Sequence, residues 1–460
     1  MSGDRSSGNR CHLLVNERNA RNRHCRARSP DSVYARAVRV HRLFAATWLV
    51  ALCLGCGEPA PALDGGPVDA AADDAEPSPD ASRLDAGGAE NCVDLASLPI
   101  CGEPVPALDE FSRILQEYML DHDISAGALG VSKDGVVLLQ QGFGWLDRGR
   151  NQPTPPDAMF RIASVTKPMT AAAVRHLIAE GTIALDDRVF DLGQPEGGLL
   201  EITPFAGLGD ARLRDVTVEH LLQHRGGWDR ALSGDFTYEE VAIADAMSVP
   251  SPPGRTNIAR YILSQPLDHE PGSTYAYANL GFMLLGLIVE QVTSEGCLEV
   301  VQTRVLAPIG VGPTHLAGAR TFEIDTLAWE PWYDGRGFQS VNVFDPMGPL
   351  VDRPYGGWHM EARIGQGGLL ADTTALLGYL GSYQVAGDGI GTPRAPGANS
   401  NWTHTGSLTG TNALATQRSS GVAIALLLNR RATGQEPSYT TELRTLLLDA
   451  ADRVVDWPTP

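Results

Sequence analysis

Ser164-Val165-Thr166-Lys167 is the stretch that decides how this chain is interpreted, because it sets a lysine three residues after a serine. Lysine is scarce: Lys133 and Lys167 are the two lysines among 460 residues. Arginine can replace lysine at most ion-pairing positions, but only a desolvated amine can lose a proton in a protein. On a helix the two side chains share one face, so Lys167 can serve as the base of a serine nucleophile. The alternative is that Ser164 only caps the following helix.

Two further polar motifs follow along the chain. Tyr277-Ala278-Asn279 opens an apolar run over residues 280 to 290, which predicts a buried helix. His404-Thr405-Gly406-Ser407 comes just ahead of a strand-like stretch. Taken singly, Tyr277 could be a half-buried ring, Asn279 a capping residue and His404 an ordinary strand histidine. The functional prediction therefore rests on the three motifs together.

This order of motifs resembles the penicillin-recognising serine hydrolases, which include class C β-lactamases, D-alanyl-D-alanine carboxypeptidases and related esterases. The resemblance covers about residues 107 to 455. It implies that Ser164 is the nucleophile and that Tyr277 shuttles the serine proton with Lys167. It also implies that Asn279 hydrogen-bonds the lysine and the carbonyl group of the substrate.

The third motif implies a strand that faces the substrate. By the resemblance, His404 and Thr405 contact the substrate, and the backbone N–H of Ser407 joins that of Ser164 in an oxyanion hole. We expect Gly406 to let the substrate approach the strand backbone closely. The β-lactamases of this family usually carry lysine where His404 stands. Since histidine titrates near neutral pH, we expect recognition of a substrate carboxylate to strengthen as the pH falls.

The segments around the motifs predict an α+β fold. Residues 128 to 132 and 136 to 140 flank an Asp-Gly turn, and residues 412 to 417 and 422 to 428 flank a second turn, so each pair predicts a hairpin. Strands near both chain ends predict one antiparallel sheet, flanked by helices, with a mostly helical subdomain inserted between them. The resemblance implies the same β-lactamase/transpeptidase-like architecture, with the active site between the sheet and the helical part.

The first 55 residues predict a leader with a lipoprotein-type signal peptide. Ten arginines lie within residues 1 to 42, and an apolar run over residues 43 to 54 follows, too short to span a bilayer. The run ends at Gly55-Cys56, which resembles a bacterial lipoprotein cleavage site. We therefore expect a lipid on Cys56 and a location in the bacterial cell envelope, facing the periplasm or the cell surface, with the lipid as the membrane contact.

Residues 56 to 106 are predicted to form a flexible tether, because Ala, Asp, Gly and Pro dominate much of this segment. The hydrolase domain is predicted over residues 107 to 460. Cys92 and Cys101 bracket a short loop and could form a disulfide in an oxidising compartment. Cys297 is expected to be a buried small hydrophobe. The net charge of −19 argues against a nucleic-acid partner.

Aromatic residues gather between residues 329 and 358, where they form either a wall facing the substrate or a small core. They are Trp329, Trp332, Tyr333, Phe338, Phe344, Tyr355 and Trp358. His224 is interpreted as a structural residue.

We expect a monomeric serine hydrolase that acts through an acyl-enzyme on small esters or amides. A D-alanyl-D-alanine carboxypeptidase with a peptidoglycan-related substrate, or a β-lactamase, is one alternative. A catalytically silent binding module is another. The chain has no HExxH, paired CxxC or phosphate-binding glycine loop, so neither a metal nor another cofactor is expected.

Overall fold

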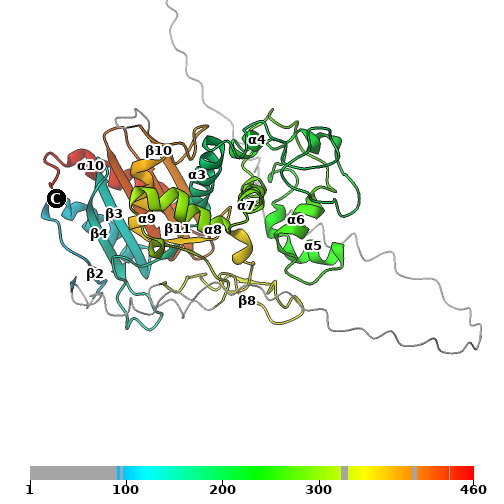
Figure 1. Ribbon diagram of the computed structural model, residues 1–460. Coiled ribbons are helices and arrows are strands. Elements are labelled where there is room, and N and C mark those ends of the chain that lie inside the picture. The colour runs from blue at the N-terminus through cyan, green and yellow to red at the C-terminus, as the bar shows by residue number, and fades with distance from the viewer. Residues whose placement is uncertain (1–90, 94–96, 323–329, 396–400, 435, 460) are drawn as a thin grey trace, which may run out of the picture. The chain divides into compact units, whose positions relative to one another are not determined.

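A seven-stranded antiparallel sheet forms the centre of the fold in the computed structural model, which describes residues 91–93, 97–322, 330–395, 401–434 and 436–459 (Figure 1). The strand order is β1-β2-β4-β3-β12-β11-β10. The strands are β1 (Cys92–Val93), β2 (Ile100–Cys101), β4 (Val136–Gly144), β3 (Ala126–Lys133), β12 (Val422–Leu428), β11 (Thr411–Gln417) and β10 (Trp402–Leu408).

The two ends of the chain meet in the middle of this sheet. β3 pairs with β12 in a register that runs from Lys133 opposite Val422 to Gly127 opposite Leu428. β3 and β4 are joined by Asp134 and Gly135, which both have positive φ, as a tight hairpin turn requires. The α+β prediction, with one sheet assembled from both chain ends, is confirmed.

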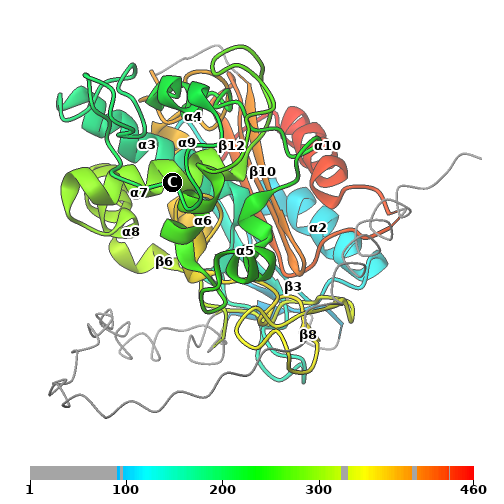
Figure 2. The ribbon, with the colours of Figure 1, turned by 90° about the vertical axis from the view of Figure 1, so that its right-hand side faces the viewer.

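Helices cover both faces of the sheet (Figures 1 and 2). On one face α2 (Asp109–Asp121) and α10 (Tyr439–Arg453) pack against the larger side chains of the strands, such as Val131 and Ile424. On the other face α9 (Thr373–Ser382) lies against β3, where a Cβ on Gly130 would come within 2.9 Å of Thr373. Small strand residues on this face therefore let the helix approach closely.

Helices are the main regular elements of the segment between the two halves of the sheet, as the sequence predicts, although more of its residues lie in loops and turns. It begins with α3 (Thr166–Ala179), which packs in the same core as α9. The further helices are α4 (Val218–Leu222), α5 (Glu240–Met247), α6 (Gly254–Ile262), α7 (Asn279–Thr293) and α8 (Cys297–Val300). Short strands form two small sheets, β5 (Phe160–Arg161), β9 (Leu369–Ala371) and β6 (Leu316–Gly318), and β7 (Gln339–Ser340) with β8 (Val351–Asp352).

The folded domain begins before residue 107, so the predicted end of the tether at residue 106 is wrong. Ile100 pairs with Phe143 of β4 and is buried with Leu98 in the core between the sheet and α2. The disulfide between Cys92 and Cys101 joins β1 to β2 at the sheet edge. The apolar residues Leu98 and Ile100 and the disulfide thus attach β1 and β2 to the edge of the main sheet. Cys56 and the rest of residues 1–90 lie outside the described residues.

The aromatic cluster divides between core and surface. Tyr333 and Trp358 are buried, whereas Phe338 and Phe344 are 52% and 40% exposed. Among the described members, none lines the cleft beside Ser164, which favours the small-core interpretation for Tyr333 and Trp358. Trp329 lies outside the described residues. Within the described part of the chain, every helix is too short or too polar to span a bilayer.

Candidate active site

Ser164 lies on a tight turn that leads into α3. The turn is a 3-10 segment, Ala163–Val165, and Ala163 before the serine has a φ of +46°. A left-handed conformation is unfavourable for alanine, and such strain often occurs where the fold fixes a reactive group. Ser164 precedes Val165, the N-cap residue of α3, and among the described residues its hydroxyl makes no hydrogen bond to a backbone N–H of that helix. Its hydroxyl is therefore available for other contacts, and the capping interpretation is not supported.

β10 runs directly beside this turn. A Cβ on Gly406 would lie 2.0 Å from the backbone oxygen of Ile162, so only glycine allows the strand to come this close. The sequence interpretation placed the substrate against Gly406, but the neighbour of this glycine is the backbone before Ser164. Gly406 therefore brings the substrate-facing strand to the serine and does not line the cleft itself.

The Ser164 hydroxyl receives two contacts from residues of the first two motifs. Tyr277 Oη donates a hydrogen bond of 2.7 Å to Ser164 Oγ. Lys167 Nζ lies 3.2 Å from the same oxygen. The structure thus brings together the three residues predicted to be catalytic, although Tyr277 is more than a hundred residues away in the chain.

The other contacts of Lys167 decide what its nitrogen can do. Lys167 Nζ donates to Asn279 Oδ1 at 2.7 Å and to the backbone oxygen of Gln366 at 2.6 Å. Both oxygens can only accept hydrogen bonds, so they occupy both N–H groups of a neutral amine. The remaining lone pair is then left for Ser164, which is the geometry of a general base.

Burial favours this neutral form. The Lys167 side chain has no solvent exposure. Desolvation lowers the pKa of Lys167 to about 7, with Asp235 opposing the change and Arg230 and Arg363 adding to it. Burial raises the pKa of Tyr277 well above its usual range. Near neutral pH, Lys167 can therefore accept a proton while Tyr277 stays protonated and donates.

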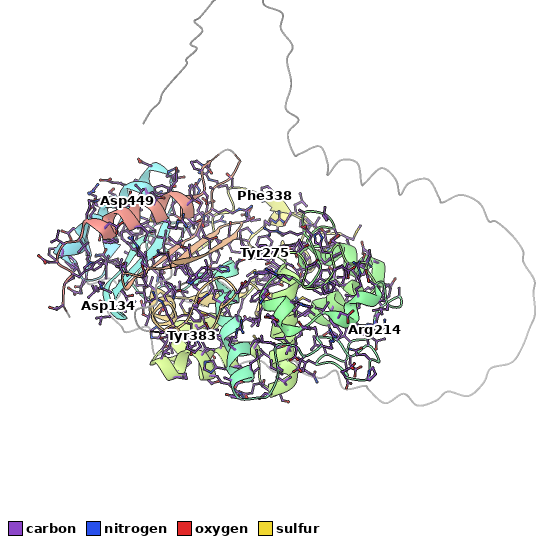
Figure 3. The ribbon with its side chains drawn as sticks, turned by 90° about the horizontal axis from the view of Figure 1, so that it is seen from above. Asp134, Arg214, Tyr275, Phe338, Tyr383 and Asp449 are labelled. Carbon is purple, nitrogen blue, oxygen red and sulfur yellow. A yellow bond between two sulfur atoms is a disulfide. The ribbon has the colours of Figure 1, made fainter. Side chains whose placement is uncertain are left out.

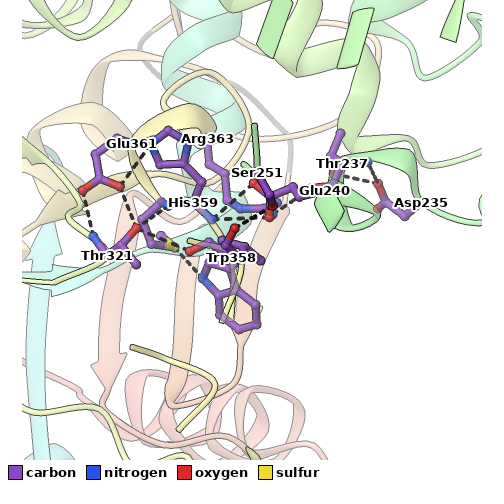
Figure 4. A network of polar contacts seen from close by, with 11 residues as sticks. Asp235, Thr237, Glu240, Ser251, Thr321, Trp358, His359, Glu361 and Arg363 are labelled. Atoms are coloured by element: carbon purple, nitrogen blue, oxygen red, sulfur yellow. Dashed lines mark hydrogen bonds and ion pairs between the residues drawn. The ribbon is translucent and has the colours of Figure 1, made fainter. Parts of the chain in front are cut away.

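Asp235 fixes the orientation of Asn279. Asn279 Nδ2 donates to Asp235 Oδ2 at 2.7 Å, so the amide oxygen must turn toward Lys167. Asp235 in turn accepts from the backbone N–H and the hydroxyl of Thr237 (Figure 4). The chain of contacts continues through Arg363, which donates to the backbone oxygen of Thr237 and to Glu240. A largely buried network of Asp235, Thr237 and Arg363 thus holds Asn279 in position against Lys167.

Sequence reasoning missed Asp235 and Arg363. Neither belongs to a recognisable motif, and Asp235 sits in a loop where a capping role is the ordinary interpretation. Its role follows from the packing of that loop against α7, which no local pattern predicts.

A cleft of about 480 Å³ opens in front of Ser164. β10 supplies one part of its lining, and residues on loops around α4 and α7 supply another. Of the predicted binding residues, His404, Thr405 and Ser407 line the cleft, whereas Asn279 lies in a small space behind Ser164 with Arg363. The lining residues are Ser164, Leu222, Gln223, His224, Arg230, Tyr275, Tyr277, Ala386, Gly387, Asp388, Ile390, Thr403, His404, Thr405 and Ser407.

His404 does not titrate where its sequence context suggests. Burial, assisted by Lys167, lowers the pKa of His404 to about 4. Its Nδ1 lies 3.2 Å from the backbone oxygen of Thr405. This lowered pKa leaves the imidazole neutral near pH 7 in the free protein, which does not support the expected rise in carboxylate recognition through neutral pH. The lowered pKa results from partial burial of the ring in the cleft and from the nearby Lys167, and both depend on packing between distant segments.

His224 supports Tyr277, in agreement with the structural interpretation. Its ring centroid lies 4.5 Å from that of Tyr277. Its Nδ1 accepts a hydrogen bond of 3.3 Å from the backbone N–H of Ala278. Burial lowers the pKa of His224 to about 3, so the ring stays neutral. His224 thus holds the segment that carries Tyr277.

Comparison with known proteins places this geometry in a family. A family model described as Beta-lactamase matches residues 111–449. The chain belongs to the beta-lactamase family. This family of serine hydrolases includes esterase and amidase relatives.

Among curated proteins, this member of the beta-lactamase family is similar to esterase EstB from Burkholderia gladioli, with 32% identity over 229 residues. The match covers 49% of this chain and 54% of EstB. The protein flp of Staphylococcus aureus is 27% identical over 209 residues, which are 44% of this chain and 38% of flp. The chain thus spans about half or less of the length of these relatives.

Solved structures share the beta-lactamase fold. D-amino acid amidase from Ochrobactrum anthropi superposes with a TM-score of 0.54 at 19% identity, over 76% of this chain and 99% of the amidase. A penicillin-binding protein homologue from Pyrococcus abyssi gives 0.51 at 23% identity, over 74% of this chain and 77% of the homologue.

None of the described cysteines, Cys92, Cys101 and Cys297, lines the cleft. Cys297 is buried at the start of α8, and burial raises the pKa of its thiol to about 12, so the prediction of an inert side chain fits the structure. Within the described residues, no group of three histidine, cysteine or acidic side chains is arranged to hold a metal ion.

Proposed function

We propose that this protein hydrolyses small carboxylic esters through an acyl-enzyme on Ser164, with amides as slower substrates. The observation that carries the proposal is the set of contacts around Lys167, in which two acceptor oxygens direct the lone pair of a buried amine to Ser164. The similarity to esterase EstB supports esters as the substrate class.

In the acylation step, Ser164 Oγ attacks the ester carbonyl carbon as its proton passes to Lys167. The backbone N–H groups of Ser164 and Ser407 stabilise the negative charge on the carbonyl oxygen. The bond to the leaving alkoxide then breaks, and Tyr277 protonates the alkoxide and recovers a proton from Lys167.

In the deacylation step, a water molecule attacks the acyl carbon and gives one proton to Tyr277 as Tyr277 passes its own proton to neutral Lys167, which later returns a proton to Ser164. The bond from the acyl carbon to Ser164 Oγ breaks, and the serine oxygen regains a proton. The carboxylic acid leaves, so one ester and one water yield one acid and one alcohol. Deacylation uses the same side chains as acylation, in the opposite direction of proton transfer.

Two rivals lead to different results. A carboxypeptidase or β-lactamase that binds the terminal carboxylate of its substrate at β10 would need a positive charge on that strand, where His404 is neutral near pH 7. A silent binding module would need no base beside Ser164.

The test is intact-mass analysis of the purified protein after exposure to a nitrophenyl ester, a fluorophosphonate and penicillin. We expect the fluorophosphonate and the ester to leave adducts on Ser164, and Ser164→Ala to abolish both. The absence of every adduct would favour the binding module, whereas a stable adduct with penicillin alone would favour the alternative substrates.

The two lysines provide a matched pair of variants. Lys167→Arg keeps a positive charge but cannot be deprotonated, so ester turnover should fall by about a hundred- to ten-thousandfold. Lys133→Arg makes the same change at the turn between β3 and β4 and should retain activity. If Lys167→Arg retained the ester turnover of the wild-type protein, Lys167 would not be the general base.

A further inference from the structure

Arg230 differs from the other arginines near the active site. Arg161 lies by the buried Glu330, and Arg363 pairs with Glu240. Arg230 lines the cleft and is exposed. Among the described residues it has no ion pair and no hydrogen-bond partner, and its contact is with the face of an aromatic ring. The N–H groups of its guanidinium thus remain available to a ligand in the cleft.

Tyr277 fixes where this positive charge lies. The guanidinium carbon of Arg230 is 4.7 Å from the centroid of the Tyr277 ring, a distance typical of a cation–π contact. The hydroxyl of the same tyrosine donates to Ser164 Oγ. The guanidinium of Arg230 thus lies over the ring whose hydroxyl contacts the nucleophile. Its N–H groups have no partner among the described residues, so they can bind a carboxylate through two hydrogen bonds.

Arg230 also differs from the other residues that line the cleft in its charge. Among the residues that line the cleft, Arg230 and the exposed Asp388 are the two with permanent charges. Three other titratable side chains of the lining, His224, His404 and Tyr277, are neutral near pH 7. Lys167 lies behind Ser164 and is partly deprotonated at that pH. Arg230 is thus the permanent cation that a substrate in this cleft meets.

We propose that Arg230 forms a subsite for a carboxylate, so that the preferred substrates are esters that carry a carboxylate near the scissile bond. This proposal rests on the esterase function proposed above and narrows its substrate class. The subsite lies on the Tyr277 side of the cleft and not on β10, where the sequence interpretation placed recognition of a carboxylate.

The kinetic test uses two pairs of esters, each with one anionic and one neutral member. Mono-4-nitrophenyl succinate and 4-nitrophenyl butyrate differ in charge on the acyl side, and 4-acetoxybenzoate and phenyl acetate differ on the leaving-group side. The measured quantity is the ratio of kcat/KM for the anionic ester to kcat/KM for the neutral ester. Any general damage to the catalytic residues cancels in this ratio.

Arg230→Gln should lower this ratio by about ten- to a hundredfold for at least one pair, since a hydrogen bond to a charged group is lost. The pair that responds identifies the side of the ester bond that carries the carboxylate. Arg230→Lys keeps the charge and should retain part of the preference. Arg214→Gln is the matched control, because Arg214 lies away from the cleft (Figure 3). An unchanged ratio in Arg230→Gln for both pairs would overturn the subsite.

A binding measurement separates failure of the subsite from failure of the esterase function. Calorimetric titration with 4-phenylbutyrate and with its neutral amide requires no turnover. We expect the wild-type protein to bind the carboxylate more tightly than the amide, and Arg230→Gln to remove the difference. If no ester is hydrolysed but the wild-type protein still binds the carboxylate more tightly than the amide, the carboxylate subsite is supported and the proposed ester hydrolysis is refuted. Equal affinities of the wild-type protein for both compounds would overturn the subsite.

Discussion

Asp235→Asn should move the pH dependence of ester hydrolysis to lower pH. The carboxylate of Asp235 favours the protonated form of Lys167, so it raises the pKa of that amine. Asparagine has nearly the same shape but no charge. The pKa of Lys167 should therefore fall, and a larger fraction of the amine should be neutral at any pH on the acid limb of the rate profile. Loss of an acidic residue thus makes the enzyme active in more acidic solution.

The size of the shift follows from the hydrogen-bonded chain. Two hydrogen bonds of 2.7 Å and one amide group separate Lys167 from Asp235. For charges about 7 Å apart at an effective dielectric constant of about 20, the attraction is roughly 2 kcal/mol, or about one and a half pKa units. Solvent screening reduces this value, so we expect the limb to move by about half a unit or more. The plateau rate should also fall, by up to about tenfold, because a neutral acceptor holds Asn279 less firmly.

The assay is kcat/KM for a neutral nitrophenyl ester measured from acid to alkaline pH, because this parameter reports the pKa of the free enzyme. Asp134→Asn is the control: it removes the same charge at the exposed β3–β4 turn, away from the cleft (Figure 3), and should leave the limb in place. A limb in Asp235→Asn that stays in place or moves to higher pH would refute the assignment of the limb to Lys167.

Three other results are expected. Lys167→Met removes a group whose pKa falls from 10.5 to about 7 on folding. In chemical denaturation, the free energy of unfolding of the wild-type protein relative to this variant should therefore increase by up to about 5 kcal/mol as the pH rises from about 7 to 10.5. A difference that does not change with pH would contradict burial of the amine. The preference of the wild-type enzyme for carboxylate-bearing esters should stay constant from about pH 5 to 8, because His404 remains neutral there, whereas a rise toward pH 5 would restore the original interpretation. Mass spectrometry of membrane-extracted protein should find a lipidated Cys56 as the N-terminus, and peptides from residues 1 to 40 in the mature protein would contradict this.

The parts of the site that the sequence predicts are those set by short spacings. Ser164 and Lys167 are three residues apart, so helical geometry alone places them together. Tyr277 and His404 could be added because each belongs to a motif with a known order. The hairpins were predictable for the same reason, since turn residues and the spacing of apolar residues around them are local signals.

The remaining features depend on contacts between distant segments. Asp235 and Arg230 lie on loops, and their positions follow from packing against α7 and Tyr277. The low pKa of His404 depends on its partial burial in the cleft and on the nearby Lys167. The early start of the domain depends on pairing between β2 and β4 and on the disulfide of Cys92 with Cys101. None of these features produces a periodic or compositional pattern in its own segment of the sequence.

The pairing of Lys133 with Val422 has a consequence for biogenesis. Contacts with such long sequence separation form slowly, and the ribosome releases the C-terminal strands last. Until those strands arrive, a growing chain holds the serine and its lysine but lacks the strand that supplies Ser407. A chain truncated before β10 should therefore react with no nitrophenyl ester, although it still contains Ser164 and Lys167.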